Sequence, residues 1–332
     1  MHIIPDNAQH IGARERQEDS FGFSSFDNEE LVKNRGCLAV IADGMGGMSS
    51  GREASNTAVQ SFLHYYQDLM NGGDFPTVLR ESLLYANQKV CQYAKENDLV
   101  NQVGTTLIAA AIKDDHLYWI SAGDSRIYLF RDHQLIQLTQ DHVYEKILLE
   151  EAASGRMSME EVKNHPQKEA LTSFLGLEEL KKIDGNVKPF PLEPGDRILL
   201  CTDGLFGFLS EEEITNTLMG HIEWASQELV NRVVGKSHPY QDNVTVAILN
   251  YRREVSHPTT QVYKEEVKPT VRQHKKTRRY LPILLSMILI IALGGGGYFG
   301  YVYLVKTEKY KEGINTVLDF FNPKNKEKEG EK

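Results

Sequence analysis

Carboxylate side chains stand beside the apolar segments of this sequence, and they are the residues whose types and positions could do chemistry. Asp43 and Asp203 each end an apolar run and precede a glycine, in CLAVIADG and RILLCTDG. Asp124 follows HLYWISA, Asp242 precedes VTVAIL, and Asp19 stands between RERQE and SFGF. A carboxylate at the end of a buried strand is costly to desolvate unless a positive charge meets it. The pattern therefore indicates a bound cation.

The types of side chain also indicate which cation. A single Asp-Gly pair is typical of a hairpin turn. Four aspartates that flank apolar runs, with little basic sequence nearby, favour a cluster of hard oxygen ligands at strand ends. The sequence has no paired His or Cys at zinc spacing, so the pattern predicts Mg²⁺ or Mn²⁺.

The elements that must position these carboxylates are predicted from the apolar periodicity. Runs rich in Val, Ile, Leu and aromatic residues predict strands at 37–42, 106–112, 116–122, 126–130, 197–202 and 244–249. Short turns predict one hairpin between 106–112 and 116–122, and a second between 116–122 and 126–130. Helical periodicity predicts helices over 52–70 and 77–96. Hairpins with helices grouped between them indicate an α+β fold, with antiparallel sheets layered by helices.

Composition limits the class of protein. With 332 residues, 41% of them hydrophobic, the chain can bury a substantial core. A net charge of −9 argues against a nucleic-acid binder. Cys37, Cys91 and Cys201 include no CxxC pair and are predicted to be buried thiols in a reducing compartment. The N-terminal MHIIPDNAQH lacks the basic and apolar regions of a signal peptide.

The C-terminal part of the sequence predicts a membrane anchor. Leu281 to Val305 are twenty-five residues without a charge, and a helix of this length, at about 1.5 Å per residue, spans a hydrocarbon core of about 30 Å. More basic residues precede the run than follow it, which predicts that its N-terminal side is cytoplasmic. Those that precede it closely are Lys268, Arg272, Lys275, Lys276, Arg278 and Arg279, and those that follow are Lys306, Lys309 and Lys311.

Four regions follow from these patterns. Residues 1–252 are predicted to form one compact domain. Residues 253–279 are polar, basic and dotted with proline, which is typical of a flexible linker that ends in a polybasic patch. Residues 280–305 are the predicted transmembrane helix, and 306–332 form a short charged tail.

Short motifs run in one order through residues 8–250: RERQEDS, VIADGMGGMSSGREAS, GTT, SAGDSRIYL, LTQDH, HPQKEALTSFLG, PGDRILLCTDGL and QDNVTV. Together they resemble the motifs of the metal-dependent protein phosphatases, the PPM or type 2C Ser/Thr phosphatases. The resemblance implies a sandwich of two antiparallel β-sheets flanked by α-helices, in four layers ordered α-β-β-α, with metals at one end. It also implies Mn²⁺ or Mg²⁺ as the cofactor, with two ions per site and a third, weaker ion.

The resemblance assigns most of the carboxylates to metal ions. Asp43 would bridge two metals, and Gly44 would lend its backbone carbonyl. Asp203 and Asp242 would complete the ligands of one metal.

The remaining assignments concern the second metal, the weaker ion and the substrate. Glu18 and Asp19 would act at the second metal, directly or through water. Asp124 would hold the weaker ion, and Arg14 would contact the substrate phosphate. On this assignment Asp43, Arg14 and Asp19 are the catalytic residues.

Several positions depart from the family pattern. Gln17 replaces the usual Asn of the first motif, and Glu169 replaces the Asn of the segment that begins at His165. Met45 and Met48 stand where the family often has a histidine, so this loop offers no histidine as a general acid. Residues 143–170 are predicted to form a mobile flap beside the site.

Other interpretations of the same residues are weaker. The run 47–51 matches GxSxG, the nucleophile elbow of α/β-hydrolases, but that serine must leave the strand directly and Ser49 lies seven positions beyond Ala42. Ser50 with Glu53 forms a capping box, which explains a serine here without chemistry. GMGGMS lacks the last glycine of the dinucleotide motif GxGxxG.

The predicted function is a metal-dependent phosphatase that hydrolyses phosphoserine and phosphothreonine on proteins, with a metal-activated water. It would be tethered by a single span, with its catalytic domain on the cytoplasmic face of a bacterial plasma membrane. An opposing membrane Ser/Thr kinase fits this topology as a partner. The alternative from another class is a catalytically inactive phosphatase fold that acts as a scaffold or binding protein at the membrane. The presence of every expected metal aspartate favours the enzyme.

Overall fold

The structure is a computed structural model that describes residues 2–24, 26–46, 50–69, 73–220 and 222–252. These residues belong to one compact unit, Met1–Thr259. The predicted linker 253–279, membrane span 280–305 and tail 306–332 lie outside the described residues. Among the residues that are described, no helix is both long and apolar enough to cross a membrane.

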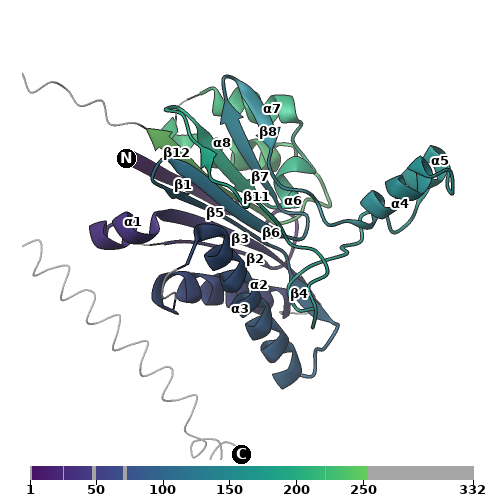
Figure 1. Ribbon diagram of the computed structural model, residues 1–332. Coiled ribbons are helices and arrows are strands. Elements are labelled where there is room, and N and C mark those ends of the chain that lie inside the picture. Colours follow the sequence, from purple (N-terminus) through teal and green to yellow (C-terminus); the bar gives the residue numbers. More distant parts are fainter. Residues whose placement is uncertain (1, 25, 47–49, 70–72, 221, 253–332) are drawn as a thin grey trace, which may run out of the picture. The chain divides into compact units, whose positions relative to one another are not determined.

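The described strands form two antiparallel sheets (Figure 1). The first sheet contains, in spatial order, β1 (His2–His10), β12 (Val244–Arg252), β11 (Arg197–Cys201), β7 (Arg126–Arg131) and β8 (Gln134–Gln137). The second contains β10 (Phe190–Pro191), β6 (His116–Ala122), β5 (Leu107–Lys113), β3 (Cys37–Gly46) and β2 (Asp19–Phe23), with β4 (Val103–Thr105) beside β3 and β9 (Asp184–Gly185) beside β6.

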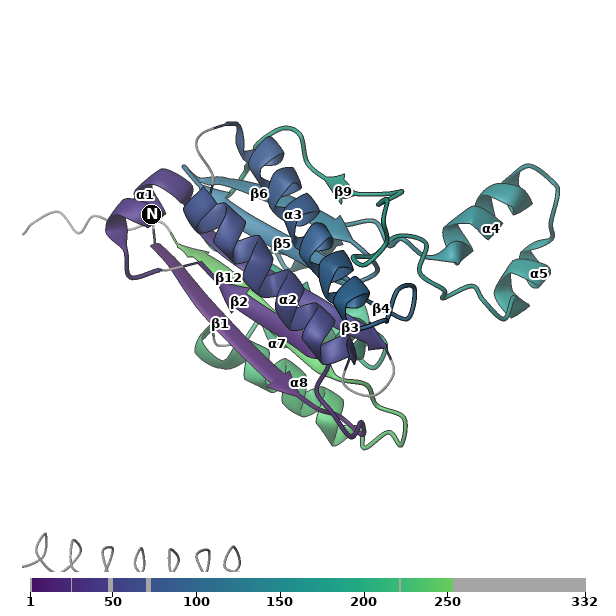
Figure 2. The ribbon, with the colours of Figure 1, turned by 90° about the horizontal axis from the view of Figure 1, so that it is seen from below.

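Helices cover the outer face of each sheet (Figure 2). The second sheet is covered by α2 (Ser50–His64), which runs on into a π-helical turn, Tyr65–Leu69, and by α3 (Phe75–Glu96). The first sheet is covered by α6 (Asp203–Phe206), α7 (Glu211–Leu218) and α8 (Ala225–Gly235), with a short 3₁₀ turn, Ile222–Trp224, before α8. A further helix, α1 (Glu29–Arg35), connects β2 to β3. The predicted α+β fold of two antiparallel sheets flanked by helices is confirmed.

The alternation of side chains in β3 shows why the central strands read as continuous apolar runs. Leu38, Val40 and Ala42 pack toward α2 and α3, whereas Ala39 and Ile41 pack between the two sheets. Successive strand residues point to opposite faces, so a strand that is covered on both sides needs apolar residues at every position. All six predicted strands are present for this reason, within a few residues of their expected ends.

The two predicted hairpins have different outcomes. Strands β5 and β6 pair as expected, and the turn between them places Asp114 and Asp115 at φ 50° and 62°. The predicted hairpin between β6 and β7 is wrong, because β6 belongs to the second sheet while β7 pairs with β11 and β8 in the first. Gly123, at φ +115°, bends the chain from one sheet to the other.

The N-terminal strands were not predicted from the periodicity. β1 is an edge strand that pairs only with β12 among the described strands, and it contains Pro5 and several polar residues. Edge strands tolerate proline and exposed polar side chains, so they give a weak sequence signal. The thiols are also less uniform than predicted: Cys37 and Cys201 are buried, but Cys91 is half-buried, and all three are free.

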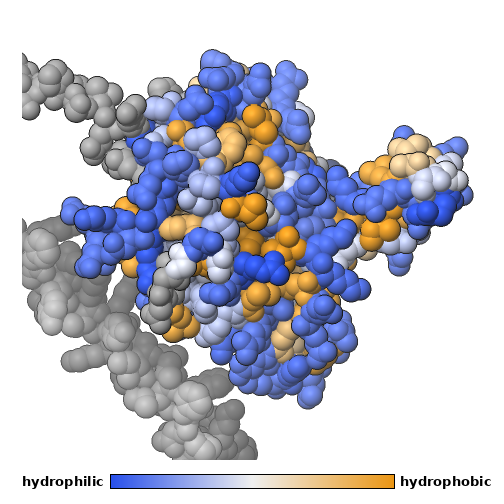
Figure 3. Space-filling model, in the orientation of Figure 1, coloured by the Kyte–Doolittle hydropathy of each residue, from blue (hydrophilic) through white to orange (hydrophobic). Residues whose placement is uncertain are grey.

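The segment expected to form a flap protrudes from the sandwich (Figure 1). It contains α4 (Tyr144–Ala153) and α5 (Met159–Asn164), and its two ends are joined by hydrogen bonds from Tyr144 N to Ala170 O and from Glu145 N to Lys168 O. Figure 3 shows both hydrophobic and hydrophilic surface on this protruding segment. Its motion stays a prediction.

Replacement of Phe62 by alanine tests the layer between α2 and the second sheet. Phe62 is 0% exposed and belongs to that apolar cluster. We expect the free energy of unfolding to fall by about 3–5 kcal/mol, because the change removes buried contacts and leaves a cavity. Urea denaturation measures the change. The matched control is Leu84→Ala on α3, where the side chain is 42% exposed and the loss should stay below about 1 kcal/mol. Equal losses in the two variants would contradict this layer arrangement.

Candidate active site

A cavity of about 310 Å³ opens at one end of the sandwich, where strands of both sheets end. Every residue predicted for the site except Asp19 lines it. The lining consists of Arg14, Glu18, Asp43, Gly44, Met45, Gly46, Thr106, Asp124, Leu171, Asp203, Asp242 and Asn243. Residues from distant parts of the chain therefore meet at one opening.

The strand register explains this meeting. Asp43 lies in β3, directly opposite Asp19 in β2. Asp203 follows β11 and Asp242 precedes β12, and these two strands are antiparallel neighbours. Asp124 lies where the chain crosses from β6 to β7. The crossing that replaced the predicted hairpin is thus what places Asp124 beside the ends of both sheets.

Asp19 is buried next to the cavity. It lines a neighbouring cavity of about 400 Å³, which also contains Gln17 and Arg52. Its Oδ2 accepts hydrogen bonds from the Thr245 and Thr202 hydroxyls at 2.7 and 3.0 Å. Within the described residues, its Oδ1 has no hydrogen-bond partner. One oxygen is held in place while the other is available to a ligand.

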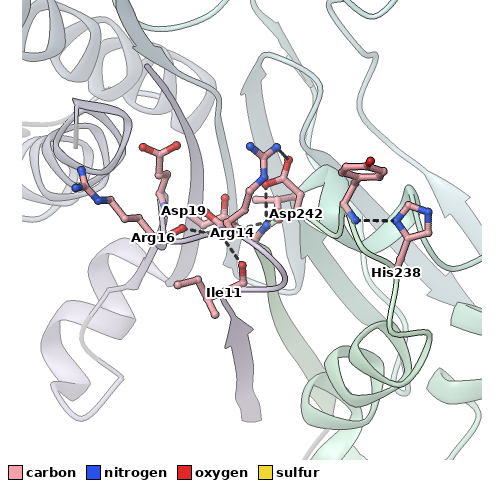
Figure 4. Close-up of polar contacts among 10 residues, drawn as sticks. Ile11, Arg14, Arg16, Asp19, His238 and Asp242 are labelled. Atoms are coloured by element: carbon pink, nitrogen blue, oxygen red, sulfur yellow. Dashed lines mark hydrogen bonds and ion pairs between the residues drawn. The ribbon is translucent and has the colours of Figure 1, made fainter. Parts of the chain in front are cut away.

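Arg14 stands at the rim of the cavity. Its Nη2 donates to Asp242 Oδ2 at 2.5 Å, and its side chain is 57% exposed. The Asn243 side chain fixes the loop that carries Arg14, since it donates to Ile11 O and Arg16 O and accepts from Glu18 N. Figure 4 shows the Arg14–Asp242 pair, with Asp19 and Arg16 on the adjoining backbone. The guanidinium is therefore held at the opening by a fixed loop.

The shared burial of these carboxyl groups changes their acidity. Burial, which is the largest cause, and the charge of Asp203 together raise the pKa of Asp19 and that of Asp124 to about 7. Burial, followed by the charge of Asp242, raises the pKa of Asp203 to about 6. The pKa of Asp43 is raised well above its ordinary value by burial and then by the charges of Asp19 and Asp203. These groups repel one another when ionised, which a cation among them would relieve.

The donor set fits a hard divalent cation. The cavity offers several carboxylates and the backbone at Gly44, and Asp203 Oδ1 is buried with no hydrogen-bond partner among the described residues. Oxygen ligands of this kind suit Mg²⁺ and Mn²⁺. As arranged, no group of three or more His, Cys, Asp or Glu side chains in the described part of the chain could hold a metal ion. The carboxyl groups share a cavity but do not form a closed cage, and their assignment as ligands stays a proposal.

Close backbone packing sets the shape of the cavity at Gly44. A Cβ atom there would lie 2.1 Å from Gly51 O and 2.6 Å from Glu18 O. The Gly44 N–H also donates to Glu18 O at 3.2 Å. Any side chain at this position would push apart β3, the start of α2 and the loop that carries Glu18.

The sequence analysis missed the polar residues that hold the carboxylates in place. Asn243 is one of them, and its only sequence signal was its position directly after Asp242. Thr106 is another: its hydroxyl accepts from Asp43 N at 2.9 Å and its own N–H donates to Asp43 O at 2.9 Å. His142 holds the Asp124 turn, because its Nδ1 accepts from Gly123 N and its N–H donates to Gly123 O.

The raised pKa values predict how stability depends on pH. Without a divalent cation, the folded domain retains protons on Asp19, Asp124 and Asp203 that the unfolded chain releases near pH 4. The domain should therefore lose stability as the pH rises from about 4 through the folded values of 6 to 7. We expect a lower melting temperature at pH 7.5 than at pH 5 in chelator, measured by differential scanning fluorimetry.

Two comparisons isolate the carboxylates in this experiment. His142 acts in the opposite sense, because burial lowers its pKa and its folded form loses stability as the pH falls. Asp124→Asn removes a carboxyl group whose pKa is raised, so it should reduce the loss of melting temperature between pH 5 and pH 7.5. Asp114→Asn, in the exposed β5–β6 turn, should not reduce it. Mn²⁺ should raise the melting temperature more at pH 7.5 than at pH 5, since it competes with protons. This account would be contradicted if both variants, without metal, melted at a higher temperature at pH 7.5 than at pH 5.

Comparison with known proteins gives the family. The sequence profile described as protein phosphatase 2C matches residues 7–236. The chain is 32% identical over 240 residues to the serine/threonine phosphatase stp of Listeria monocytogenes, and the match covers 71% of this chain and 90% of that protein.

Solved structures show the same fold. The serine/threonine phosphatase PstP/Ppp of Mycobacterium tuberculosis matches with a TM-score of 0.62 and 28% identity, over 76% of this chain and 99% of that one. The catalytic domain of the serine threonine protein phosphatase PstP in complex with 2 manganese ions matches with a TM-score of 0.60 and 27% identity, over 76% and 99%. With a family profile that covers well over half of its residues, the chain belongs to the protein phosphatase 2C family of serine/threonine phosphatases.

Proposed function

We propose that this chain hydrolyses phosphoserine and phosphothreonine on proteins with a metal-activated water. The observation that carries the proposal is the single cavity that gathers four buried or half-buried aspartates and one exposed arginine. The family and the solved relative with two manganese ions support a dependence on Mn²⁺ or Mg²⁺. Two ions per site, with a third that binds more weakly, is the stoichiometry we propose.

The proposed metal ligands follow from the cavity lining and the family resemblance. Asp43 would be shared by two ions, with the Gly44 carbonyl, Asp203 and Asp242 completing the ligands of one of them. Glu18 and Asp19 would serve the second ion, directly or through water. When bound, such ions neutralise a phosphate and lower the pKa of a water.

Asp124 would hold the third ion, at the crossing between the two sheets. Its backbone is fixed by the Gly123–His142 pair, and its carboxyl group lines the same cavity as Asp43. This arrangement would add an ion at the edge of the cavity without changing the central ligands.

Arg14 is the proposed phosphate ligand. A phosphomonoester carries close to two negative charges near pH 7, and a guanidinium can donate two parallel hydrogen bonds to its oxygens. Arg14 is exposed and fixed at the rim by the Asn243 loop, so it can exchange Asp242 for an incoming phosphate. A lysine would supply the charge without the paired hydrogen bonds.

The leaving group lacks an evident histidine acid. Within the described lining of the cavity there is no histidine, and Met45 occupies one of the positions where the family often has one. Met48 lies outside the described residues, as does Ser49 of the GxSxG match. We propose that water protonates the leaving alkoxide.

Replacement of Asp43 by asparagine tests the enzymatic proposal. With Mn²⁺ and p-nitrophenyl phosphate, kcat/KM should fall by more than about 100-fold, since loss of even an outer hydrogen-bond partner of a metal ligand costs about 10–100-fold. Asp114→Asn makes the same chemical change in the exposed β5–β6 turn. This turn lies at the end of β5 and β6 that is away from the cavity, so the change should leave turnover within about twofold. No turnover by the unaltered protein in Mn²⁺ or Mg²⁺ would instead support the inactive scaffold.

We also propose that residues 280–305 anchor the protein in the plasma membrane, with the phosphatase domain in the cytoplasm. The uncharged run and the excess of basic residues before it support this topology. β12 begins beside Asp242 at the cavity and ends at Arg252. The last described residue therefore lies at the end of β12 that is away from the site. An opposing membrane Ser/Thr kinase would then work on the same pool of phosphoproteins.

Truncation tests the anchor. A chain that ends at Arg252 should move from the membrane pellet to the supernatant on ultracentrifugation, while the full chain stays in the pellet until detergent is added. A chain truncated after Lys306 keeps the apolar run and serves as the matched control, which should remain in the pellet. Recovery of the full chain in the supernatant would rule out the anchor and leave the phosphatase proposal intact.

A further inference from the structure

Three aromatic side chains form a connected strip near the rim of the active-site cavity. The Phe208 and His238 rings have centroids 5.3 Å apart, and those of His238 and Tyr240 are 6.1 Å apart, both edge to face. Tyr240 is 83% exposed, the most exposed of the large hydrophobic side chains in the described residues. We call Phe208, His238 and Tyr240 the aromatic ledge.

The loop that carries the aromatic ledge has a defined backbone. After α8, Ser237 adopts φ 49° and its N–H donates to Val234 O. The Tyr240 N–H donates to His238 Nδ1 at 3.3 Å, and the Gln241 N–H donates to His238 O at 3.2 Å. Tyr240 is therefore presented to solvent by a turn that its neighbours hold, so little backbone freedom remains to be lost when its ring is covered.

The same loop is joined to the loop of the phosphate ligand. Gln241 O accepts from Ala13 N at 2.9 Å, next to Arg14 in the sequence. Gly12 packs so tightly here that a Cβ would lie 2.2 Å from Asp242 O. Figure 4 shows His238 to the right of the Arg14–Asp242 pair. A phosphorylated side chain that reaches Arg14 would bring its own flanking residues to this rim.

We propose that Tyr240 is a specificity-determining residue that packs against an apolar or aromatic side chain close to the phosphoresidue of the substrate protein. The inference rests on the proposed function, and it adds a preference of sequence to it. An exposed tyrosine offers a rigid apolar face at low entropic cost, and such residues contribute strongly to protein recognition.

Single exposed hydrophobic residues are ordinary, and position distinguishes Tyr240 from the others. Val187, Met159 and Trp224 are also exposed, at 81%, 63% and 70%, and neither they nor Tyr240 line the cavity itself. Tyr240 instead belongs to the aromatic ledge and stands two residues before Asp242, which lines the cavity. The hydrogen bond from Ala13 N to Gln241 O places the loop of Tyr240 next to the loop of Arg14, where the flanking residues of a bound phosphoresidue would lie.

A set of phosphothreonine peptides tests the proposal with the full chain. Each peptide has alanine around the phosphothreonine except for one phenylalanine, which is moved from three positions before it to three positions after it. We expect one or two positions to raise kcat/KM by about two- to tenfold over the all-alanine peptide, which is what one aromatic contact contributes. The gain should come from KM, because the contact forms in ground state and transition state alike.

Variants of Tyr240 then assign the preference. Tyr240→Ala should remove it, Tyr240→Phe should keep it, and Trp224→Ala, at the other end of α8, should not change it. The idea fails if the unaltered protein shows no preference among peptides that it hydrolyses, or if Tyr240→Ala retains the preference. It also fails if Tyr240→Ala slows p-nitrophenyl phosphate, which has no flanking residues, as much as the peptides. If the unaltered protein hydrolyses neither peptides nor p-nitrophenyl phosphate, the proposed function falls and this inference with it.

Discussion

The burial of several like-charged carboxyl groups at one end of a β-sandwich is the constraint on which the rest of this structure depends. Asp203 raises the pKa of Asp19, Asp43 and Asp124, and burial alone would already raise each of them. Charges repel more strongly in a partly desolvated cavity than in water. The fold must therefore hold these groups together through interactions that do not depend on their charge.

Two kinds of interaction provide this. The first is the apolar core, because β3 is covered on both faces and its end, with Asp43, cannot move without disturbing both packed layers. The second is a set of neutral hydrogen bonds around the acids. Thr202 and Thr245 hold Asp19, Thr106 holds the backbone of Asp43, and Asn243 ties together the loops on either side. Donors of this kind stabilise a buried carboxylate without neutralising it.

The resulting cavity has its charges arranged in a useful order. Half-buried acids line the cavity, a fixed arginine stands at the rim, and an aromatic side chain lies beyond the rim on the adjoining loop. A dianionic ester would contact Arg14 at the rim and any metal ions that the acids hold, so binding and reaction would occur in the same place. The last described strand, β12, ends at Arg252, at its end away from this opening.

The sequence alone determined the central strands, the β5–β6 hairpin, the helices that cover the second sheet and the identity of the acids. These features follow from local periodicity and turn chemistry, which short stretches of sequence encode. Only the tertiary structure decided that the chain crosses between sheets at Gly123, that β1 and β2 pair where they do, and that Asn243 fixes the loop of Arg14. Strand partners far apart in the sequence are chosen by the packing of whole sheets, and the same glycine turn suits a hairpin or a crossing. The meeting of Tyr240 with the rim belongs to this second class, because the hydrogen bond from Ala13 to Gln241 joins loops that no local pattern connects.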